Sequence, residues 1–353
     1  MHRCSRLALI SLGVVAALPL SALPADASGT VSAPIASGLA GPLQLSVGSD
    51  GSIYVGQDFS GTLTKIKKGK TSTVYQASSG AEVAGVDARG AGTLVFTTTS
   101  GASEETSATA SALVSALPNG KTKQLADLYA WEHTHNPDSI NTYGFSGLSD
   151  SCKATWDSEI PDDPYDGLLD THPYAVAIVP GGWVVADAAG NDLLKVTPNG
   201  RVTTLAVLPG QPVPISASDA EMYGLPACAA GSTYTAEPVP TDVEVGPDGM
   251  LYVSTLSGDP APGSVYRVNP STGAYTKIAT GFAGATNLAV APDGTVYVTE
   301  LFADRISRVS GGGPVPVESL PSPAAVEWSN GKLVASQFAL GGPDGGQIVT
   351  VTP

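Results

Sequence analysis

The chain has 353 residues and a formal net charge of −15 at pH 7, from 32 Asp and Glu residues against 17 Lys and Arg. Such an acidic chain repels nucleic acid, which we therefore exclude as a partner. Gly and Pro are abundant, at 41 and 28 residues, and only 14% of the residues are charged, a composition that favours strands and turns over helices.

The first 27 residues have the features of a signal peptide. Arg3 and Arg6 precede a largely apolar stretch at residues 7–20, and Ala25-Asp26-Ala27 matches a cleavage pattern. The apolar stretch is short for a membrane span, and no later stretch is comparable. The sequence therefore predicts a secreted, extracellular protein that is cleaved after Ala27 and does not insert into a membrane.

Residues 28–353 repeat a unit of an apolar strand, a Gly-containing turn and a second strand. Asp-Gly and Asn-Gly pairs supply the positive φ angles that tight hairpin turns need. A third and a fourth strand follow in most copies. The clearest copies are residues 44–47 with 53–55, 242–245 with 251–253 and 287–290 with 296–298, and weaker ones start near residues 83, 174 and 325. Six units of four antiparallel strands predict an all-β fold, a six-bladed β-propeller.

The last unit lacks a fourth strand, because the chain ends soon after its third strand at residues 347–351. We expect the N-terminal strand at residues 31–35 to pair there and close the ring. Two insertions, at about 129–171 and 210–237, each follow a fourth strand and are expected to act as lids on one face. Cys152 lies in the first insertion and Cys228 in the second, so we predict a disulfide between them.

The repeats resemble NHL-type propeller repeats. More specifically, HPYAVA at 172–177, VVADAAGNDLL at 184–194 and EPVPTDV at 237–243 are similar to the ScyD/ScyE family, exported proteins named for the cyanobacterial scytonemin pigment cluster. The resemblance covers most of the chain after the signal peptide. It implies a propeller and export, and it implies no catalytic residues.

Aligning the units places Gln44, Asp242 and Asn287 at the start of innermost strands, where the central channel opens on the lid face. Asp187 and Glu300 follow second strands and face the same side. Carboxylate and amide oxygens suit a hard cation such as Ca²⁺, so Asp242, Asn287 and Glu300 are the candidate metal ligands. The alternative is that these groups cap strand ends and hold channel water.

His172 opens the third unit beside this channel mouth and is the candidate catalytic residue, a general base near neutral pH. Lactonases of the SMP-30/gluconolactonase type have a similar carboxylate and amide metal site, and virginiamycin B lyase resembles them in having six blades, with His and Glu on loops. The alternative is that His172, which precedes a Pro, is a hydrogen-bonded loop residue.

The first insertion contains aromatic and metal-binding residue types. Trp131 and Trp156 are candidates for stacking on a ligand, or they pack the insertion onto the blades. His133 and His135 share one side if the segment is extended, where they suit Zn²⁺ or Cu²⁺ together with Glu132 or Asp138. The alternative is that these His residues belong to an exposed loop.

The sequence predicts a secreted, monomeric propeller that acts as a ligand-binding or scaffold protein. Its partner would be a small molecule or an extracellular protein, and the ligand would lie under the lids at the channel mouth. The alternative is a metal-dependent lactonase or lyase. No nucleophile elbow, phosphate-binding loop or dinucleotide-binding motif occurs in the chain.

Overall fold

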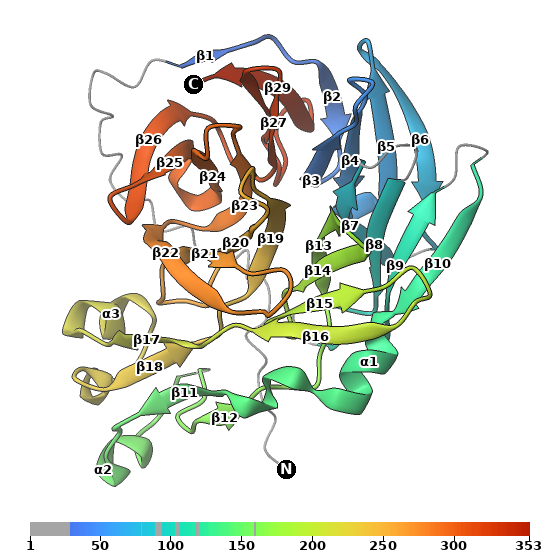
Figure 1. Ribbon diagram of the computed structural model, residues 1–353. Helices are drawn as coiled ribbons and strands as arrows, with labels where there is room; N and C mark the ends of the chain where they lie inside the picture. Colours follow the sequence, from blue (N-terminus) through green and yellow to red (C-terminus); the bar gives the residue numbers. More distant parts are fainter. Residues whose placement is uncertain (1–28, 79, 89–93, 103–105, 117–119, 159) are drawn as a thin grey trace.

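The computed structural model describes residues 29–353, apart from residues 79, 89–93, 103–105, 117–119 and 159. The signal peptide expected at residues 1–27 lies outside this part. The described chain is all-β and forms antiparallel sheets of four strands, one of them with an additional strand. Most of the sheets stand around a common centre, which makes the molecule a β-propeller (Figure 1). No helix within the described ranges is long and apolar enough to cross a membrane.

Six sheets form a closed circle, because each innermost strand contacts the next one and the last contacts the first. The innermost strands are β3 (Pro42–Val47), β7 (Ala81–Asp87), β13 (Pro173–Val179), β19 (Pro240–Val245), β23 (Ala285–Val290) and β27 (Val326–Ser329). The second strands are β4 (Ile53–Gln57), β8 (Leu94–Ser100), β14 (Gly182–Asp187), β20 (Leu251–Thr255), β24 (Val296–Glu300) and β28 (Lys332–Gln337).

The outer half of each sheet follows the same order along the chain. The third strands are β5 (Thr62–Lys67), β9 (Ala110–Ala116), β15 (Asp192–Val196), β21 (Gly263–Val268), β25 (Arg305–Ser310) and β29 (Gly346–Thr352). The outermost strands are β6 (Lys70–Gln76), β10 (Thr122–Asp127), β16 (Val202–Val207), β22 (Tyr275–Phe282) and β26 (Gly313–Ser319). Two 3₁₀ turns, η1 (Asp58–Ser60) and η4 (Leu301–Ala303), connect second to third strands.

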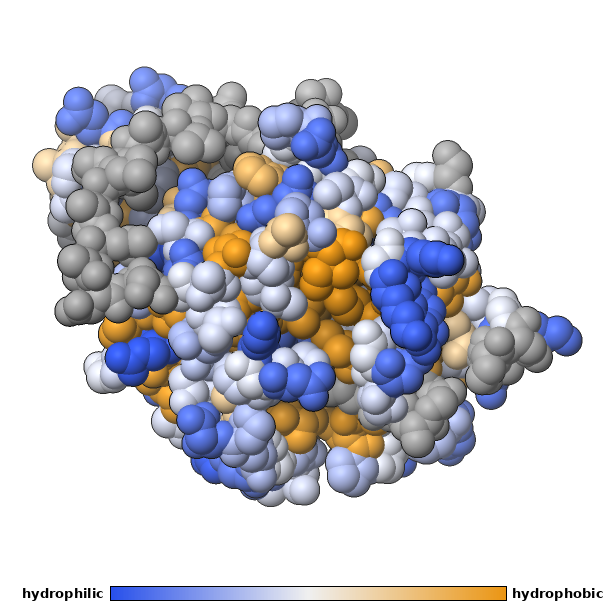
Figure 2. All heavy atoms as spheres, turned by 90° about the horizontal axis from the view of Figure 1, so that it is seen from above, coloured by the Kyte–Doolittle hydropathy of each residue, from blue (hydrophilic) through white to orange (hydrophobic). Residues whose placement is uncertain are grey.

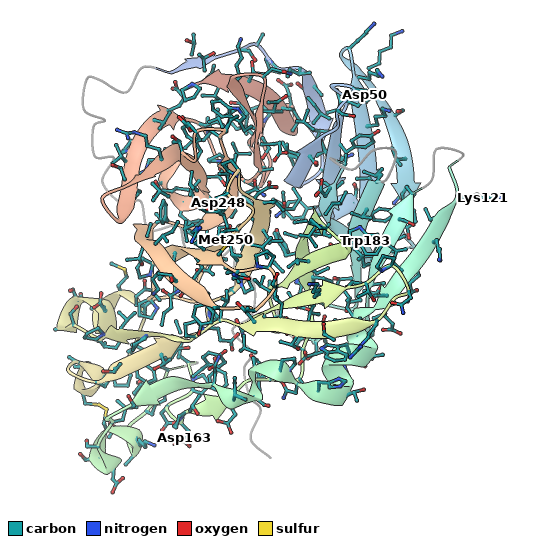
Figure 3. All side chains as sticks on the ribbon, in the orientation of Figure 1. Asp50, Lys121, Asp163, Trp183, Asp248 and Met250 are labelled. Carbon is teal, nitrogen blue, oxygen red and sulfur yellow. A yellow bond between two sulfur atoms is a disulfide. The ribbon has the colours of Figure 1, made fainter. Side chains whose placement is uncertain are left out.

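The turns between first and second strands have the chemistry expected from the sequence. Gly51 and Gly249 have φ angles of 72° and 74°, which a residue with a side chain adopts only with strain. The preceding Asp side chain completes the turn: Asp248 Oδ1 accepts the N–H of Met250 at 3.1 Å (both labelled in Figure 3), and Asp50 has the same role in the first sheet. The sequence therefore predicted these hairpins correctly.

Apolar side chains fill the space between neighbouring sheets. Within the described residues, one buried cluster lies between each pair of neighbours around the circle. Between the sheets that begin with β13 and β19, for example, Leu193, Val253 and Tyr266 are at most 1% exposed. Burying a side chain of this size stabilises the fold by about 1.5–3 kcal/mol. Each sheet is thus covered on both faces by its neighbours.

The chain ends close the circle. β1 (Thr30–Val31) and β2 (Ala36–Leu39) both pair with β29, the third strand of the last sheet. Between them, the N–H of Ile35 donates to the carbonyl of Ile348 at 2.7 Å, so the contact continues along the edge. The predicted N-terminal closure is confirmed, with the pairing divided between two short strands.

Seen from above this edge, hydrophilic and hydrophobic residues are mixed over the surface (Figure 2).

The two insertions form a seventh sheet together, ordered β12-β11-β18-β17, which we call the accessory sheet. Its strands are β11 (Thr142–Ser146), β12 (Tyr165–Asp166), β17 (Gln211–Pro214) and β18 (Thr233–Ala236). The helices and 3₁₀ turns of the insertions are α1 (Leu128–His135), η2 (Pro137–Ile140), α2 (Asp150–Lys153), α3 (Ala217–Met222) and η3 (Ala227–Ala229). The expected disulfide between Cys152 and Cys228 is present, with Cα atoms 5.7 Å apart (yellow bond in Figure 3).

The position of the accessory sheet differs from the expectation. In Figure 1 it lies beyond β16, at the outside of the circle and away from its centre. The insertions were expected to cover the channel mouth as lids. Instead their strands pair with each other and bury an apolar cluster of their own, which includes Phe145, Ile215 and Tyr234. Because the two insertions build a sheet and an apolar core of their own, they lie at the outside of the ring.

Candidate functional site

Asp242 and Asn287 connect successive innermost strands. Asp242 Oδ2 accepts the N–H of Leu288 at 2.9 Å, and Asn287 Oδ1 accepts the N–H of Val326 at 2.8 Å. Both side chains are at most 4% exposed. These polar groups satisfy backbone donors of the next sheet, which is the strand-capping alternative that the sequence left open.

Gln44 connects sheets on opposite sides of the ring. Its Nε2 donates to the carbonyl of Thr241 in the fourth sheet at 2.9 Å, and its Oε1 accepts from Asn287 Nδ2 in the fifth at 2.8 Å. The structure therefore brings Gln44 and Asn287 together, as the alignment of the units predicted. Their contacts are with each other and with the backbone, so they hold the inner strands in place.

Glu300 does not join this group, and the predicted metal set of Asp242, Asn287 and Glu300 is wrong in this respect. Glu300 is fully buried inside its own sheet and accepts two hydrogen bonds from the Arg305 guanidinium, at 2.7 and 3.0 Å. It also accepts from Ser307 Oγ. The Glu300 side chain at the end of β24 points along the sheet toward β25. There it forms an ion pair with Arg305 that has a structural role.

The two Trp side chains that were candidates for ligand stacking pack the insertions instead. Trp131 lies against the cluster between the second and third sheets, and its Nε1 donates to Thr204 Oγ1 at 3.3 Å. Trp156 packs edge-on against Phe145 in the accessory sheet, and its Nε1 donates to the carbonyl of Ile160 at 2.7 Å. Both indole N–H groups are thus used within the fold.

His133 and His135 lie on the helix α1 and not on a strand. Positions two apart on a helix point in different directions, so the expected pair of metal ligands does not form. Each ring stacks on the aromatic side chain four residues earlier, Tyr129 or Trp131, with centroids 3.8 and 3.6 Å apart. Both His residues are exposed.

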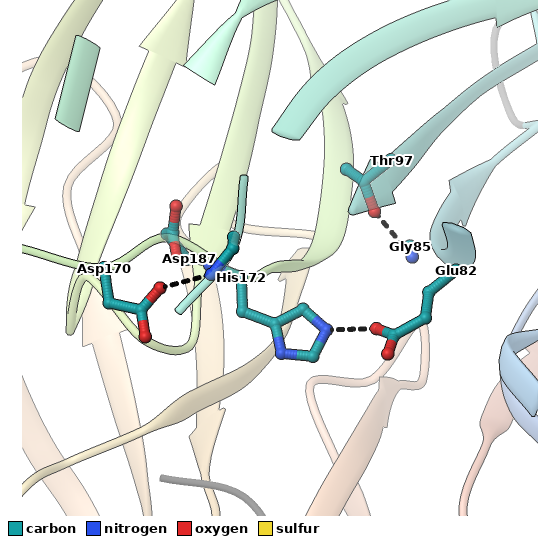
Figure 4. A network of polar contacts seen from close by, with 7 residues as sticks. Glu82, Gly85, Thr97, Asp170, His172 and Asp187 are labelled. Carbon is teal, nitrogen blue, oxygen red and sulfur yellow. Dashed lines mark hydrogen bonds and ion pairs between the residues drawn. The ribbon is translucent and has the colours of Figure 1, made fainter. Parts of the chain in front are cut away.

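His172 forms the centre of a different polar group. Its Nε2 lies 2.6 Å from Glu82 Oε2, in an ion pair between the segment before β13 and the start of β7 (Figure 4). Only 6% of the His172 side chain is exposed, against 28% for Glu82, so solvent reaches the pair from the Glu82 side. His172 Nδ1 is buried and has no hydrogen-bond partner. One ring nitrogen is thus held in place and the other is unused.

The backbone around this pair explains why the two side chains meet. β7 and β13 approach so closely at Gly85 that a Cβ atom there would lie 2.6 Å from the Cα of Ala175. Only Gly fits this approach. Thr97 Oγ1 accepts the N–H of Gly85 at 2.8 Å, which compensates for an irregularity in the β7 pairing (Figure 4).

Asp187 fixes the loop that carries His172. Its carboxylate accepts hydrogen bonds from Thr171 Oγ1, from the His172 N–H at 2.6 Å and from the Gly190 N–H at 3.1 Å. Asp187 lies at the end of β14, the position that the sequence predicted for it, and it is 1% exposed. It therefore acts as a positioning residue for His172.

Asp58 completes the group. It lies in η1, directly after β4, and its buried Oδ1 has no hydrogen-bond partner. Burial and the nearby Glu82 charge raise the pKa of Asp58 to about 7, although the His172 charge opposes this. Burial would lower the pKa of His172, but the hydrogen bond and charge of Glu82, with Asp58 and Asp187 near, raise it above its ordinary value. Asp58, Glu82 and His172 form the candidate site.

An apolar cluster from several sheets adjoins the candidate site through Tyr174. Leu43, Ala84, Tyr174 and Ala324 belong to one buried cluster at the channel mouth, together with residues of the loops after β14 and β28. The Tyr174 ring meets the His172 ring edge-on at 5.6 Å between centroids. A histidine between carboxylates and apolar walls is in a setting where proton transfer to a small molecule is effective.

The sequence pointed to His172 and Asp187 but missed Asp58 and Glu82. Asp58 lies one residue beyond Gln57, the residue that occupies the strand-end position of Asp187 and Glu300, so the alignment of the units does not single it out. Glu82 lies at the first-strand end of a sheet whose pairing is irregular between Val83 and Val86. That irregularity shifts the register, and no sequence pattern marks it.

Known structures resemble this fold at low sequence identity. The catalytically inactive virginiamycin B lyase from Staphylococcus aureus with quinupristin is 16% identical at a TM-score of 0.52, covering 92% of this chain and all of that one. The PQQ-bound aldose sugar dehydrogenase from Streptomyces coelicolor is 16% identical at a TM-score of 0.54, covering 94% and 99%. A protein provisionally described as a gluconolactonase is 13% identical at 0.53, covering 93% of both chains.

The comparisons at the level of sequence found no relative. No protein-family model matches the chain. No curated protein matches it either. The structural neighbours are propeller enzymes, and at these identities their likeness to this chain shows that it has the β-propeller fold.

Proposed function

We propose that this protein binds a small molecule at the channel mouth and cleaves it by acid–base chemistry, as a lyase or lactonase does. The observation that carries the proposal is the state of His172: Glu82 holds its Nε2 at 2.6 Å, while its buried Nδ1 has no partner. An oriented imidazole with one unused nitrogen is the usual arrangement of a catalytic general acid or base.

The pKa shifts of His172 and Asp58 suit them to different roles in proton transfer. The raised pKa of His172 favours its protonated form, which can donate from Nδ1 to a departing oxygen. Asp58, with a pKa of about 7, is partly ionised there and can accept a proton. In an elimination, Asp58 would take a proton from carbon, a double bond would form, the carbon–oxygen bond would break and His172 would protonate the oxygen. Pairs of groups with separated roles of this kind are typical of acid–base enzymes.

The structural neighbours support the class of reaction without fixing it. Virginiamycin B lyase was solved with quinupristin, and a second neighbour is provisionally described as a gluconolactonase. Both descriptions concern reactions at small molecules by propellers. The proposal does not include a metal-dependent lactonase, because Glu300, one of the candidate metal ligands, forms an ion pair with Arg305.

The test is turnover of quinupristin, gluconolactone and simple aryl esters, followed by chromatography. His172→Gln should lower kcat by about 10²–10⁴-fold, since it removes the proton donor. Activity should rise with pH as Asp58 ionises near pH 7 and fall again above the raised pKa of His172. His133→Gln, a substitution of an exposed His on α1, is the control and should leave kcat unchanged. Full activity of His172→Gln would refute the proposed mechanism.

A second candidate function is ligand binding without catalysis. Such a function would use the apolar cluster next to the candidate site, which includes Leu43, Ala84 and Ala324, because sites for small ligands are mostly apolar. Calorimetry separates binding from catalysis. A compound that the protein binds but never converts, and that the His172→Gln variant binds with the same affinity, would support the binding function.

We also infer that the protein is exported, that its ring counts as six blades with the accessory sheet outside it, and that it is a divergent relative of the ScyD/ScyE family. The disulfide supports export, since such bonds persist in oxidising compartments. The six apolar clusters between neighbouring sheets support the blade count. A secreted monomer whose partner is a small molecule fits these inferences, and mass measurement of the exported chain would test cleavage after Ala27.

A further inference from the structure

The densest group of positive charges in the chain lies at the turn between β5 and β6. Four of the ten lysines fall within residues 65–70, and residues 59–81 contain no acidic residue. Lys67, Lys68 and Lys70 are all exposed. Such a concentration of positive charge contrasts with the rest of this chain, whose 32 acidic residues outnumber its 17 basic ones.

The equivalent hairpin of the second sheet, between β9 and β10, adds two more exposed lysines, Lys121 and Lys123. The two hairpins belong to sheets that pack together, because Tyr75 of β6 and Val114 of β9 share one apolar cluster. Lys121 and Asp50, which lies beside the first hairpin, are labelled in Figure 3. We call the lysines of both hairpins the lysine surface: Lys65, Lys67, Lys68, Lys70, Lys121 and Lys123.

The lysine surface and the candidate site lie at opposite ends of the sheets. In the first sheet, β5 begins directly after η1, which carries Asp58, and it ends at Lys67. The length of a strand therefore separates the two regions. A partner that occupies the lysine surface leaves the channel mouth open to a small molecule.

Local hairpin chemistry disfavours these lysines. Lys68 is the first residue of a two-residue turn and has a φ angle of 52°, in the left-handed region that a long side chain adopts only with strain. Lys67 and Lys70 lie directly opposite each other on β5 and β6. Like charges in opposite positions on paired strands destabilise a hairpin.

The hairpin between β27 and β28 shows what the same kind of turn prefers. Its first turn residue is Asn330, with a φ angle of 50°, and Asn is one of the residues favoured at this position. The opposed residues that flank the turn are Ser329 and Lys332, so they bring no like charges together. Residues that break local rules in the way Lys68 does are concentrated at functional sites.

Acidic neighbours neutralise only part of the lysine surface. Lys67 Nζ donates to Asp50 Oδ2 at 2.6 Å, in a pair of which both side chains are about half exposed. None of the ion pairs between described residues involves Lys68, Lys70 or Lys123. Positive charge thus remains for an external anionic partner.

Two further features indicate the chemistry of that partner. Next to Lys70, β6 exposes three hydroxyl-bearing residues in succession, Thr71, Ser72 and Thr73, and hydroxyl groups both donate and accept hydrogen bonds. None of the large apolar side chains that are exposed among the described residues lies on β5, β6, β9 or β10. The lysine surface therefore has hydroxyls that suit a sugar and no apolar group to insert into lipid.

We propose that the lysine surface binds a linear acidic polysaccharide, whose carboxylates pair with the lysines while its hydroxyl groups bond to residues 71–73. A single strand contacts the lysine surface alone, and charges farther away than about 8–10 Å are largely screened at physiological ionic strength. A membrane or another broad anionic surface would also face the acidic remainder of the chain, which repels it. Such binding would hold the protein on a polysaccharide layer outside the cell.

The first test measures binding of the full mature chain to immobilised polygalacturonate, a linear polymer of carboxylated sugars. We expect binding at low salt that weakens by about tenfold or more in about 0.5 M NaCl, because salt screens exposed charges. Neutral dextran should not bind, and phosphatidylglycerol vesicles should bind more weakly than polygalacturonate. Absence of polygalacturonate binding, or equal or tighter binding to the vesicles, would overturn the proposal.

The second test locates the binding. Three substitutions remove the charges at the turn between β5 and β6: Lys67→Gln, Lys68→Asn and Lys70→Gln. The combined variant should bind polygalacturonate about tenfold or more weakly, since it loses three of the cations that attract the polymer. The matched control removes the same charge outside the lysine surface: Lys153→Gln, Arg308→Gln and Lys332→Gln. Equal losses of affinity in the two variants would mean that only net charge matters, and the lysine surface would be no site.

The single variant Lys68→Asn separates binding from a structural role. Asn tolerates the left-handed backbone better than Lys, so Tm should rise or stay the same while the affinity for polygalacturonate falls. Scanning calorimetry and the binding assay measure the two effects on the same preparation. A lower Tm together with unchanged affinity would show that Lys68 supports the fold, and would contradict its assignment to the lysine surface.

Discussion

Buried polar side chains in this protein differ mainly in whether all of their polar atoms have hydrogen-bond partners. Glu300 has two hydrogen bonds from Arg305 and further donors, and Asp187 has three donors. His172 and Asp58 each keep one buried atom without a partner. Glu300 and Asp187, whose sets are complete, hold strands and loops, whereas His172 and Asp58, whose sets are incomplete, are the two residues to which we assign proton transfer.

The Glu300–Arg305 pair gives a prediction at this scale. Arg305→Met should lower the free energy of unfolding by about 3–5 kcal/mol, because it leaves a fully buried carboxylate without its counter-charge. Urea denaturation measures the loss. The matched control is Arg267→Met: its pair with Asp248 is more than one-third exposed on the Arg side, and the cost should stay below about 1 kcal/mol. Equal losses in the two variants would contradict the structural role of Glu300.

At the scale of elements, the accessory sheet is the least expected part of the molecule. Two segments far apart in the sequence pair through β11 and β18, and the disulfide between α2 and the turn η3 joins them again. The whole third sheet of the ring lies between the two cysteines in the chain, over a separation of 76 residues. A covalent link across such a long segment restricts the unfolded chain strongly.

The disulfide should therefore contribute to stability, by about 2–4 kcal/mol in the chain-entropy view. The double variant Cys152→Ser, Cys228→Ser should melt at a lower temperature, and the loss should appear first in proteolysis of the accessory sheet. Mass spectrometry of unreduced peptides checks the bond itself in exported protein. An unchanged melting temperature would mean that the apolar cluster around Phe145 and Tyr234 holds the accessory sheet without the bond.

At the scale of the whole molecule, the closed ring depends on the contact between the two chain ends. β1 and β2 cover the outer edge of β29, which would otherwise expose unpaired N–H and carbonyl groups. A propeller whose last sheet lacks its outer strand keeps an open edge, and its first and last sheets then depend on the apolar cluster between them and on the contact of β27 with β3.

Deleting residues 29–36 from the mature chain should lower Tm and promote association through the exposed edge of β29. Scanning calorimetry and light scattering measure the two effects. A chain that begins at Gly29 is the control and should behave as the mature protein does. A deletion variant that melts at the control temperature would show that the ring closes through the apolar cluster alone.

The sequence by itself determined the repeating hairpins, the propeller, the closure by the N-terminal strand and the disulfide partners. These depend on local chemistry: alternating apolar residues, Gly at positive φ and cysteines too few to pair otherwise. The tertiary structure decided where the insertions lie, that Glu300 faces Arg305, and that Glu82 and Asp58 meet His172. Those contacts depend on an irregular strand register and on side-chain directions across separate sheets, which spacing along one chain does not encode.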